Sequence, residues 1–155
     1  MATGSSDRTI KIWEIKDGKL FQTLVGHKKG VWCVKFITKF LLCSGSHDST
    51  LKIWNFKQGT CTRTLYSHSG PIWSLAQQDN ILISASQDKT AKVWDISSCS
   101  LIYSLAGHKE AVFCADIQSK TIVTGSADKV ILLNSFKESL NLCSLNEDRE
   151  TMEFT

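Results

Sequence analysis

Residues 46–54 read SHDSTLKIW, a polar turn followed by an apolar run that ends on tryptophan. The pattern Ser-x-Asp-x-Thr, with Trp four residues after the Thr, recurs about every forty residues along the chain. Its copies are Ser5, Asp7, Thr9 and Trp13; Ser46, Asp48, Thr50 and Trp54; Ser86, Asp88, Thr90 and Trp94; and a shortened copy, Ser126 and Asp128. Fixed self-similarity at this period predicts a repeat fold, in which neighbouring units cover each other's apolar faces.

Short apolar runs separated by turn residues predict four strands in each repeat. In the second repeat the expected strands are Val31 to Ile37, Phe40 to Ser44, Thr50 to Phe56 and Cys61 to Tyr66. Turn signals lie between them at Asp48-Ser49 and Gln58-Gly59. No stretch keeps a 3.6-residue period long enough for a helix, so helical repeats are excluded.

The third and fourth repeats follow the same plan. Their expected strands are Ile72 to Ala76, Ile81 to Ser84, Thr90 to Ile96 and Leu101 to Leu105, then Val112 to Ile117, Thr121 to Thr124, Val130 to Phe136 and Leu140 to Leu145. Four strands per repeat with apolar residues on both faces favour blades stacked around an axis, as in a β-propeller. A β-sandwich gives no reason for the same polar residues to recur at one period.

The chain resembles WD40 repeats over most of its length. The resemblance lies in the Ser-x-Asp turns and in three dipeptides: Gly26-His27, Gly107-His108 and Trp94-Asp95. His27 precedes Asp48 by 21 residues, and the next two His to Asp spacings are 20 residues each. The resemblance implies an all-β WD40 propeller segment of about four four-stranded antiparallel blades, the first and last incomplete, open or completed by oligomerisation.

The expected boundaries follow from the phase of the repeats. WD40 repeats are predicted over residues 1–145, as a partial blade 1–25, blades 26–66 and 67–106, and a degenerate blade 107–145. Residues 146–155 are predicted to be the start of a further strand or a disordered tail.

The resemblance also implies a chain of hydrogen bonds inside each blade, from the turn Asp to the His, from the His to a strand Ser, and from that Ser to the Trp indole. Its expected members are His27, Ser46, Asp48 and Trp54; His68, Ser86, Asp88 and Trp94; His108, Ser126 and Asp128; and Ser5, Asp7 and Trp13. Such a chain pairs polar atoms that would otherwise be buried without partners, and each bond contributes about 1 kcal/mol net.

Ser, His and Asp together also resemble a hydrolase triad. A catalytic site needs one nucleophile beside one oxyanion hole, whereas the same trio recurs here in consecutive repeats, with a Trp beside it. We therefore expect no catalytic residue and no enzyme activity. We also expect no cofactor, and no metal site, because the six cysteines form no Cys-x-x-Cys pair.

Propellers of this family generally bind proteins on the face where the innermost strands begin, which predicts a protein interaction scaffold or adaptor. Five residues after each His lie Trp32, Trp73 and Phe113. The positions before the turn Asp hold His47 and Gln87, with Ser6 and Ala127 at the equivalent places. Aromatic side chains dominate binding energy at interfaces. The alternative interpretation is that these aromatic residues only pack between blades.

The repeats resemble most closely those of F-box WD-repeat ubiquitin-ligase adaptors, because the loops joining their first two strands are short. A substrate-recognition subunit of a ubiquitin ligase is therefore an alternative function. The phosphopeptide readers of that group carry arginine at the two partner-facing positions of a blade. Here those positions hold Trp32, Trp73, Phe113, His47, Gln87 and Ala127. This difference argues against a bound phosphopeptide.

The net charge of +3 comes mostly from scattered lysines, because only three of the eighteen basic residues are arginine. Specific phosphate recognition favours arginine, so nucleic acid is not the expected partner. A scaffold in an RNA-processing complex is the second alternative function. The cysteines mostly interrupt apolar runs, where a free thiol packs as a small hydrophobe in a reducing compartment. With no apolar stretch long enough to span a membrane, a cytoplasmic or nuclear location is expected.

Propellers of this family usually close with seven or eight blades, and the chain supplies about half of that number. It opens inside a second strand, Ala2 to Ser5, and ends at Thr151 to Phe154, where a fresh first strand would begin. Three interpretations remain open: a fragment or isoform of a longer propeller, a homodimer that completes the ring, and a closed monomer of four blades.

The fourth repeat departs from the pattern, because Asn134 stands where the others have Trp, and this leads to a prediction about rigidity. Without an indole to close the hydrogen-bond chain, this repeat should be the least rigid of the four. Hydrogen-exchange mass spectrometry should therefore find its strands the least protected, and a profile in which they are the best protected would contradict the prediction.

Overall fold

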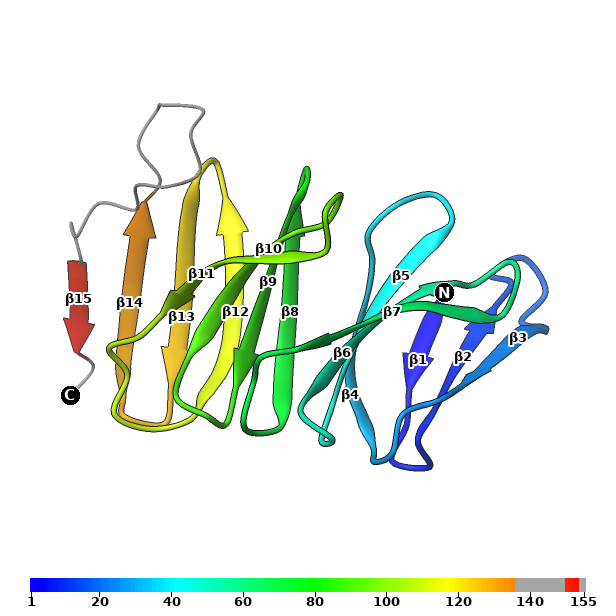
Figure 1. The fold of residues 1–155 in the computed structure, drawn as a ribbon, viewed down its shortest axis with the longest axis horizontal. Helices are drawn as coiled ribbons and strands as arrows, with labels where there is room; N and C mark the ends of the chain where they lie inside the picture. Colours follow the sequence, from blue (N-terminus) through cyan, green and yellow to red (C-terminus); the bar gives the residue numbers. More distant parts are fainter. Residues whose placement is uncertain (136–149, 154–155) are drawn as a thin grey trace. The chain divides into compact units, whose positions relative to one another are not determined.

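The computed structural model describes residues 1–135 and 150–153, and within them it contains fifteen β-strands and no helix. The strands form four antiparallel sheets, one for each repeat, with successive strands paired side by side (Figure 1). The expected all-β class is confirmed. No helix that could span a membrane occurs in this described part of the chain.

The first two sheets belong to the N-terminal repeats. The first is β1 (Ala2–Gly4), β2 (Thr9–Trp13) and β3 (Leu20–Val25). The second is β4 (Val31–Phe36), β5 (Leu41–Ser46), β6 (Thr50–Asn55) and β7 (Thr60–Tyr66). In both sheets the strands pair in the order in which they occur in the sequence.

The other two sheets repeat this order. The third is β8 (Ile72–Gln78), β9 (Ile81–Ser86), β10 (Ala91–Asp95) and β11 (Ser100–Leu105). The fourth is β12 (Val112–Gln118), β13 (Thr121–Ser126), β14 (Val130–Ser135) and β15 (Glu150–Glu153). The chain forms two compact units, Met1–Trp73 and Ser74–Thr155, and the boundary between them falls inside β8.

Each unit has its own apolar core. Residues alternate between buried and partly exposed along β2, as the period of two in a strand requires. The first core consists of Ile10, Ile12, Leu24, Val31, Leu42 and Trp54. The second core consists of Ala76, Ile83, Ala91, Val93, Leu105 and Ile122. Branched residues dominate both cores because they pack well on a pleated surface.

In β1 and β5 a glycine just before the polar turn lets the first strand of the next sheet approach closely. A Cβ on Gly4 would lie 2.8 Å from Cγ1 of Val31, at the start of β4. A Cβ on Gly45 would lie 2.6 Å from both Cγ2 of Ile72 and Sγ of Cys33. The missing side chains therefore create the space that the neighbouring strand fills.

The polar turn that follows β1, β5, β9 and β13 has the same backbone form in every repeat. The residue after each turn Asp has a left-handed conformation, with φ of 75° at Arg8, 67° at Ser49, 69° at Lys89 and 65° at Lys129. The turn Asp offers a local acceptor to the backbone two residues on, as Asx turns do. In the second repeat Thr50 donates its backbone N–H to Oδ1 of Asp48 over 3.0 Å.

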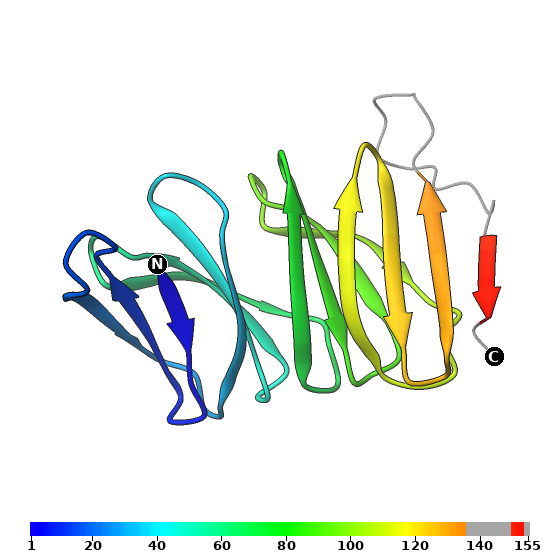
Figure 2. The same ribbon diagram turned by 180° about the vertical axis from the view of Figure 1, so that it is seen from behind.

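The C-terminal strand differs from the expectation. Residues near Thr151 were expected to begin a new repeat, but β15 pairs with β14 as the fourth strand of its sheet (Figure 2). Its register places Met152 opposite Ile131. The same register position is held by Leu24 opposite Ile10, Leu65 opposite Leu51 and Leu105 opposite Ala91. The strand expected at Leu140 to Leu145 lies outside the described residues.

The close approach at Gly45 leads to a stability prediction. Gly45→Ala should destabilise the protein by about 1–3 kcal/mol, because the new methyl group overlaps Ile72 and Cys33. Chemical denaturation measures the effect. In a double-mutant cycle with Ile72→Ala, the cost of Gly45→Ala should shrink, and strictly additive effects would show that the two residues do not compete for space.

Candidate functional site

In the second repeat, a chain of side-chain hydrogen bonds joins the turn to the buried strands. His27 contacts Oδ2 of Asp48 through Nδ1 over 2.9 Å and Oγ of Ser44 through Nε2 over 2.7 Å. The indole N–H of Trp54 donates to the same Ser44 oxygen over 2.8 Å. The predicted order of Asp, His, hydroxyl and indole is therefore present in this sheet.

The hydroxyl in this chain is not the predicted one. Ser44 bridges His27 and Trp54, so the expectation for Ser46 is wrong. Ser46 instead caps the loop before β4, where its Oγ lies 2.9 Å from the carbonyl oxygen of Gly30 and accepts the backbone N–H of Asp48 over 3.1 Å. Both serines lie on one face of β5, since they are two residues apart, but the Trp54 indole reaches only the nearer one.

The same correction applies to the first and third repeats, where the hydroxyl that accepts the indole N–H lies two residues before the predicted serine. Ser84 accepts the Trp94 indole N–H over 2.9 Å, and Thr3 accepts that of Trp13 over 3.0 Å. The predicted serines, Ser5, Ser86 and Ser126, each accept the backbone N–H of the turn Asp instead.

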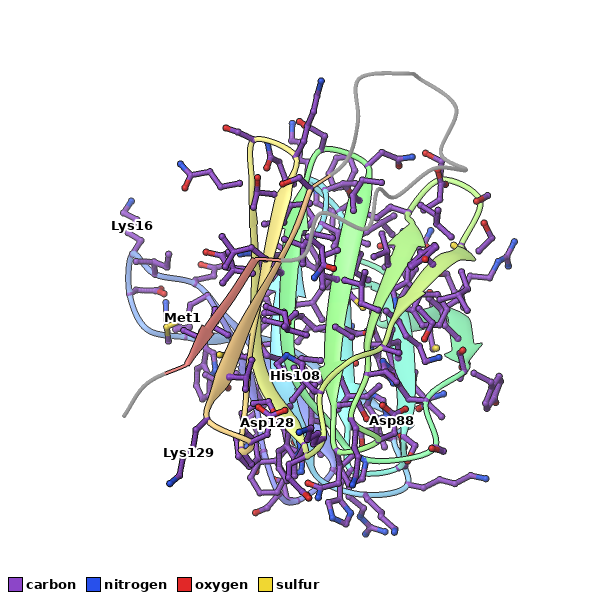
Figure 3. All side chains as sticks on the ribbon, turned by 90° about the vertical axis from the view of Figure 1, so that its left-hand side faces the viewer. Met1, Lys16, Asp88, His108, Asp128 and Lys129 are labelled. Carbon is purple, nitrogen blue, oxygen red and sulfur yellow. The ribbon has the colours of Figure 1, made fainter. Side chains whose placement is uncertain are left out.

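The fourth repeat has the same hydrogen bonds from the turn Asp through the His to a strand hydroxyl. His108 lies 3.0 Å from Oδ2 of Asp128 and 2.9 Å from Oγ1 of Thr124. Figure 3 shows His108 and Asp128 together at the end of the sheet, with Lys129 directed away from them. Asn134 occupies the position of the tryptophan and is itself buried. The series of hydrogen bonds therefore stops at Thr124, because this repeat has no indole to continue it.

The third repeat supplies the remaining predicted members. His68 is buried, with 8% of its surface exposed. Asp88 accepts the backbone N–H of Thr90 over 3.0 Å and its hydroxyl over 2.6 Å. Asp7 in the first repeat accepts the same two groups of Thr9. The turn Asp thus accepts the same two hydrogen bonds wherever a Thr stands two residues after it.

Burial and hydrogen bonding set the charge state of the buried pair. Burial raises the pKa of Asp48, but hydrogen bonds from Thr50, from the backbone N–H of Lys28 and from His27 outweigh this effect and lower the pKa to about 2. Burial lowers the pKa of His27, and Asp48 only partly opposes that shift. At neutral pH the pair is therefore a carboxylate and a neutral imidazole.

Burial makes the serine of this hydrogen-bond chain unsuitable as a nucleophile. Ser44 is fully buried, and its oxygen already bonds both His27 and Trp54. A buried hydroxyl that is already hydrogen-bonded in this way is not accessible to a substrate carbonyl in this structure. Within residues 1–135, where side chains are described, no three His, Cys, Asp or Glu residues are grouped so that they could hold a metal ion.

Two of the predicted partner-binding aromatic residues lie at the start of first strands, on β-bulges. The register of β4 shifts between Val31 and Cys33, which leaves Trp32 as the extra residue, and β12 has the same shift around Phe113. A bulge re-aims a side chain away from the regular face of a sheet. Trp32 and Phe113 are each 52% exposed.

Trp73 completes a pair with Trp32 within the first unit. Their ring centroids are 5.5 Å apart, with an interplanar angle of 50°. Tilted aromatic pairs at this distance are favourable. Trp73 is half-buried, and its ring contacts the more exposed ring of Trp32. The other predicted contact residues, His47 and Gln87, are exposed in the turns before Asp48 and Asp88.

The chain is similar to a known family of repeats and to short stretches of several known proteins. The family WD40, described as WD domain, G-beta repeat, matches residues 1–14, 18–55, 59–95 and 99–133. The Lissencephaly-1 homolog of Heterostelium pallidum is 53% identical over 36 residues, which are 23% of this chain and 9% of that protein. Transducin beta-like protein 3 of Bos taurus is 49% identical over 35 residues, which are 23% and 4%. F-box/WD repeat-containing protein sel-10 of Caenorhabditis elegans is 53% identical over 32 residues, which are 21% and 6%. The matched stretches thus span less than a tenth of each of these three relatives.

The buried pair leads to a prediction about pH. The lowered pKa of His27 contributes stability that is present above its unfolded-state pKa of about 6.5 and is lost as the pH falls below it. The contribution of Asp48 is lost only at lower pH, between about 4 and 2. The free energy of unfolding should therefore fall from pH 7.5 to pH 5. The equilibrium constant for unfolding should rise by up to about tenfold for each pH unit.

Chemical denaturation across this pH range measures the effect. His27→Gln should lower stability at neutral pH and flatten its pH dependence between pH 7.5 and 5. The matched control is His47→Gln, which removes an exposed imidazole and should leave the slope unchanged. An equal slope in the wild type and in His27→Gln would show that His27 does not contribute to it.

Proposed function

The chain belongs to the WD40 repeat family, and on this premise we propose that it is a non-enzymatic scaffold that binds partner proteins at the ends of the first strands. WD40 repeats imply a protein-interaction scaffold. The observation that carries the finer proposal is the pair Trp32 and Trp73, half-exposed and half-buried, at the starts of β4 and β8.

The position of this pair supports binding rather than packing alone. A ring that only filled space in the core would be buried, as Trp54 is with 1% exposed, whereas half of Trp32 is exposed. Trp32 is also held rigidly, because it contacts Trp73 and sits on a bulge next to a hydrogen-bonded turn. Rigid, partly exposed aromatic residues bury large areas on binding at little entropic cost.

Phe113 extends the proposal to the second unit. It occupies the bulge in β12 that corresponds to the position of Trp32 in β4, and it has the same exposure. The loop beside it is also fixed, since Ser126 donates from Oγ to the carbonyl oxygen of Glu110 over 3.1 Å. Repetition of one exposed aromatic position is expected when successive repeats contribute to one type of surface.

The proposal concerns the mode of binding and not a particular assembly. The relatives have names that point to different cellular roles. They include an F-box/WD repeat-containing protein and the U3 small nucleolar RNA-associated protein 13 of Saccharomyces cerevisiae. The narrower roles, in a ubiquitin ligase or in an RNA-processing complex, each require an assembly that these short matches do not specify.

Substitution of the aromatic residues tests the proposal. A partner is first identified by affinity capture and mass spectrometry, and its affinity is then measured by calorimetry. The double variant Trp32→Ala and Trp73→Ala should weaken binding by about 2 kcal/mol or more, or about 30-fold. Phe113→Ala tests separately whether the equivalent position of the second unit contributes to binding.

The matched control is Tyr66→Ala, which removes an aromatic ring that is 77% exposed at the end of β7, the outermost strand of the second sheet. It should leave the affinity unchanged. Thermal unfolding of all variants shows whether the fold is intact. Unchanged affinity in the folded double variant would refute this binding surface.

A further inference from the structure

Three segments of the first unit converge on Gly30 next to Trp32. The backbone N–H of Val31 donates to the carbonyl oxygen of Ser5 over 2.9 Å, and that of His47 donates to the carbonyl oxygen of Gly30 over 2.9 Å. A Cβ on Gly30 would lie only 3.2 Å from Cα of Ser6. The turn before β2, the loop before β4 and the turn after β5 therefore form one continuous surface.

Three of the exposed residues on these segments are basic: Arg8, Lys28 and Lys29. We call this surface, together with His47 and Trp32, the basic aromatic surface. No ion pair engages its three cations among the residues that the structure describes. Their charges are therefore available to a partner.

The carboxylates near this surface compensate little of its charge. Asp48 has only 6% of its side chain exposed and accepts hydrogen bonds from His27, from Thr50 and from the backbone N–H of Lys28. Asp7 is exposed, and its Oδ1 accepts the backbone N–H and the hydroxyl of Thr9. These segments thus carry one exposed carboxylate and three exposed cations.

We propose that the basic aromatic surface binds an acidic peptide segment of a partner protein, with one large apolar side chain against Trp32 and flanking carboxylates paired with Arg8, Lys28 and Lys29. This proposal rests on the proposed function, because it assigns the chemistry of the partner to the same surface. Complementary charge steers the encounter and fixes the register of the peptide, while the buried apolar side chain supplies most of the affinity.

Single-stranded nucleic acid suits the surface less well. Such strands bind along platforms of successive aromatic residues, each of which stacks a base. Trp32 and Trp73 contact each other at 50°, so they do not offer two separate parallel faces. Arg8 is the only arginine among the three cations, and specific phosphate recognition favours the guanidinium fork.

Fluorescence anisotropy with the full chain and four labelled probes tests the proposal. The first probe is a peptide with one Trp flanked by three Glu on each side. The second has Gln in place of every Glu, and the third has Lys. The fourth is an oligouridine RNA. The acidic peptide should bind about tenfold more tightly than the neutral one, as a few exposed charge pairs together provide, and the preference should decrease with added salt.

Charge reversal identifies the residues responsible. The double variant Lys28→Glu and Lys29→Glu should reduce the affinity for the acidic peptide at least to that for the neutral one. The matched control is Lys16→Glu with Lys39→Glu, which changes the net charge equally at exposed lysines in the turns at the other ends of β2 and β4. This control should retain most of the preference.

The outcomes separate the two proposals. Equal affinity for acidic and neutral peptides, equal effects of the two double variants, tighter binding of RNA, or no binding of the acidic peptide would each overturn the inference about an acidic partner. If a neutral peptide binds and Trp32→Ala abolishes that binding, the proposed function stands and only the partner chemistry is wrong. If a captured partner protein is unaffected by Trp32→Ala, the proposed function itself fails.

Discussion

The buried contact between His27 and Asp48 holds together the parts of the repeat that are distant in sequence. His27 lies before β4, Asp48 lies after β5, and the imidazole continues to Ser44 and Trp54 in the interior of the sheet. A carboxylate this deeply buried is stable only if its oxygens are hydrogen-bonded. Asp48 meets that condition through Thr50, the backbone N–H of Lys28 and His27, so that turn, loop and strand are fixed together.

The candidate binding surface depends on this constraint. The loop that Asp48 holds at Lys28 leads directly to Gly30, and the bulge that exposes Trp32 begins one residue later. Ser46 adds a second link between the turn and the loop through the carbonyl oxygen of Gly30. The buried hydrogen bonds thus fix the loop that precedes the exposed Trp32. A rigid support lowers the entropic cost of binding, and this is the physical link between the fold and the proposed function.

Much of the fold and part of the site can be predicted from the sequence. The spacing from His27 to Asp48 and the apolar run before Trp54 predict four strands and a polar turn, because both features are local or repeat at a fixed period. The identity of the bridging hydroxyl could not be predicted in this way. Ser44 and Ser46 lie on the same face of β5, so the alternation along a strand does not distinguish them. The recurrence of Ser or Thr at Thr3, Ser44, Ser84 and Thr124 was the signal that could have identified it.

The sequence by itself determined the repeat, its period, the all-β class and the aromatic residues at the start of each first strand, because these depend on residue type and spacing along the chain. Only the tertiary structure decided which hydroxyl meets the indole, that β15 completes the fourth sheet, and that Trp32 contacts Trp73. Each of these depends on strand register or on the approach of residues far apart in sequence. The tertiary structure also brings together the segments that carry Arg8, Lys28 and His47, because backbone hydrogen bonds join these three segments next to Gly30.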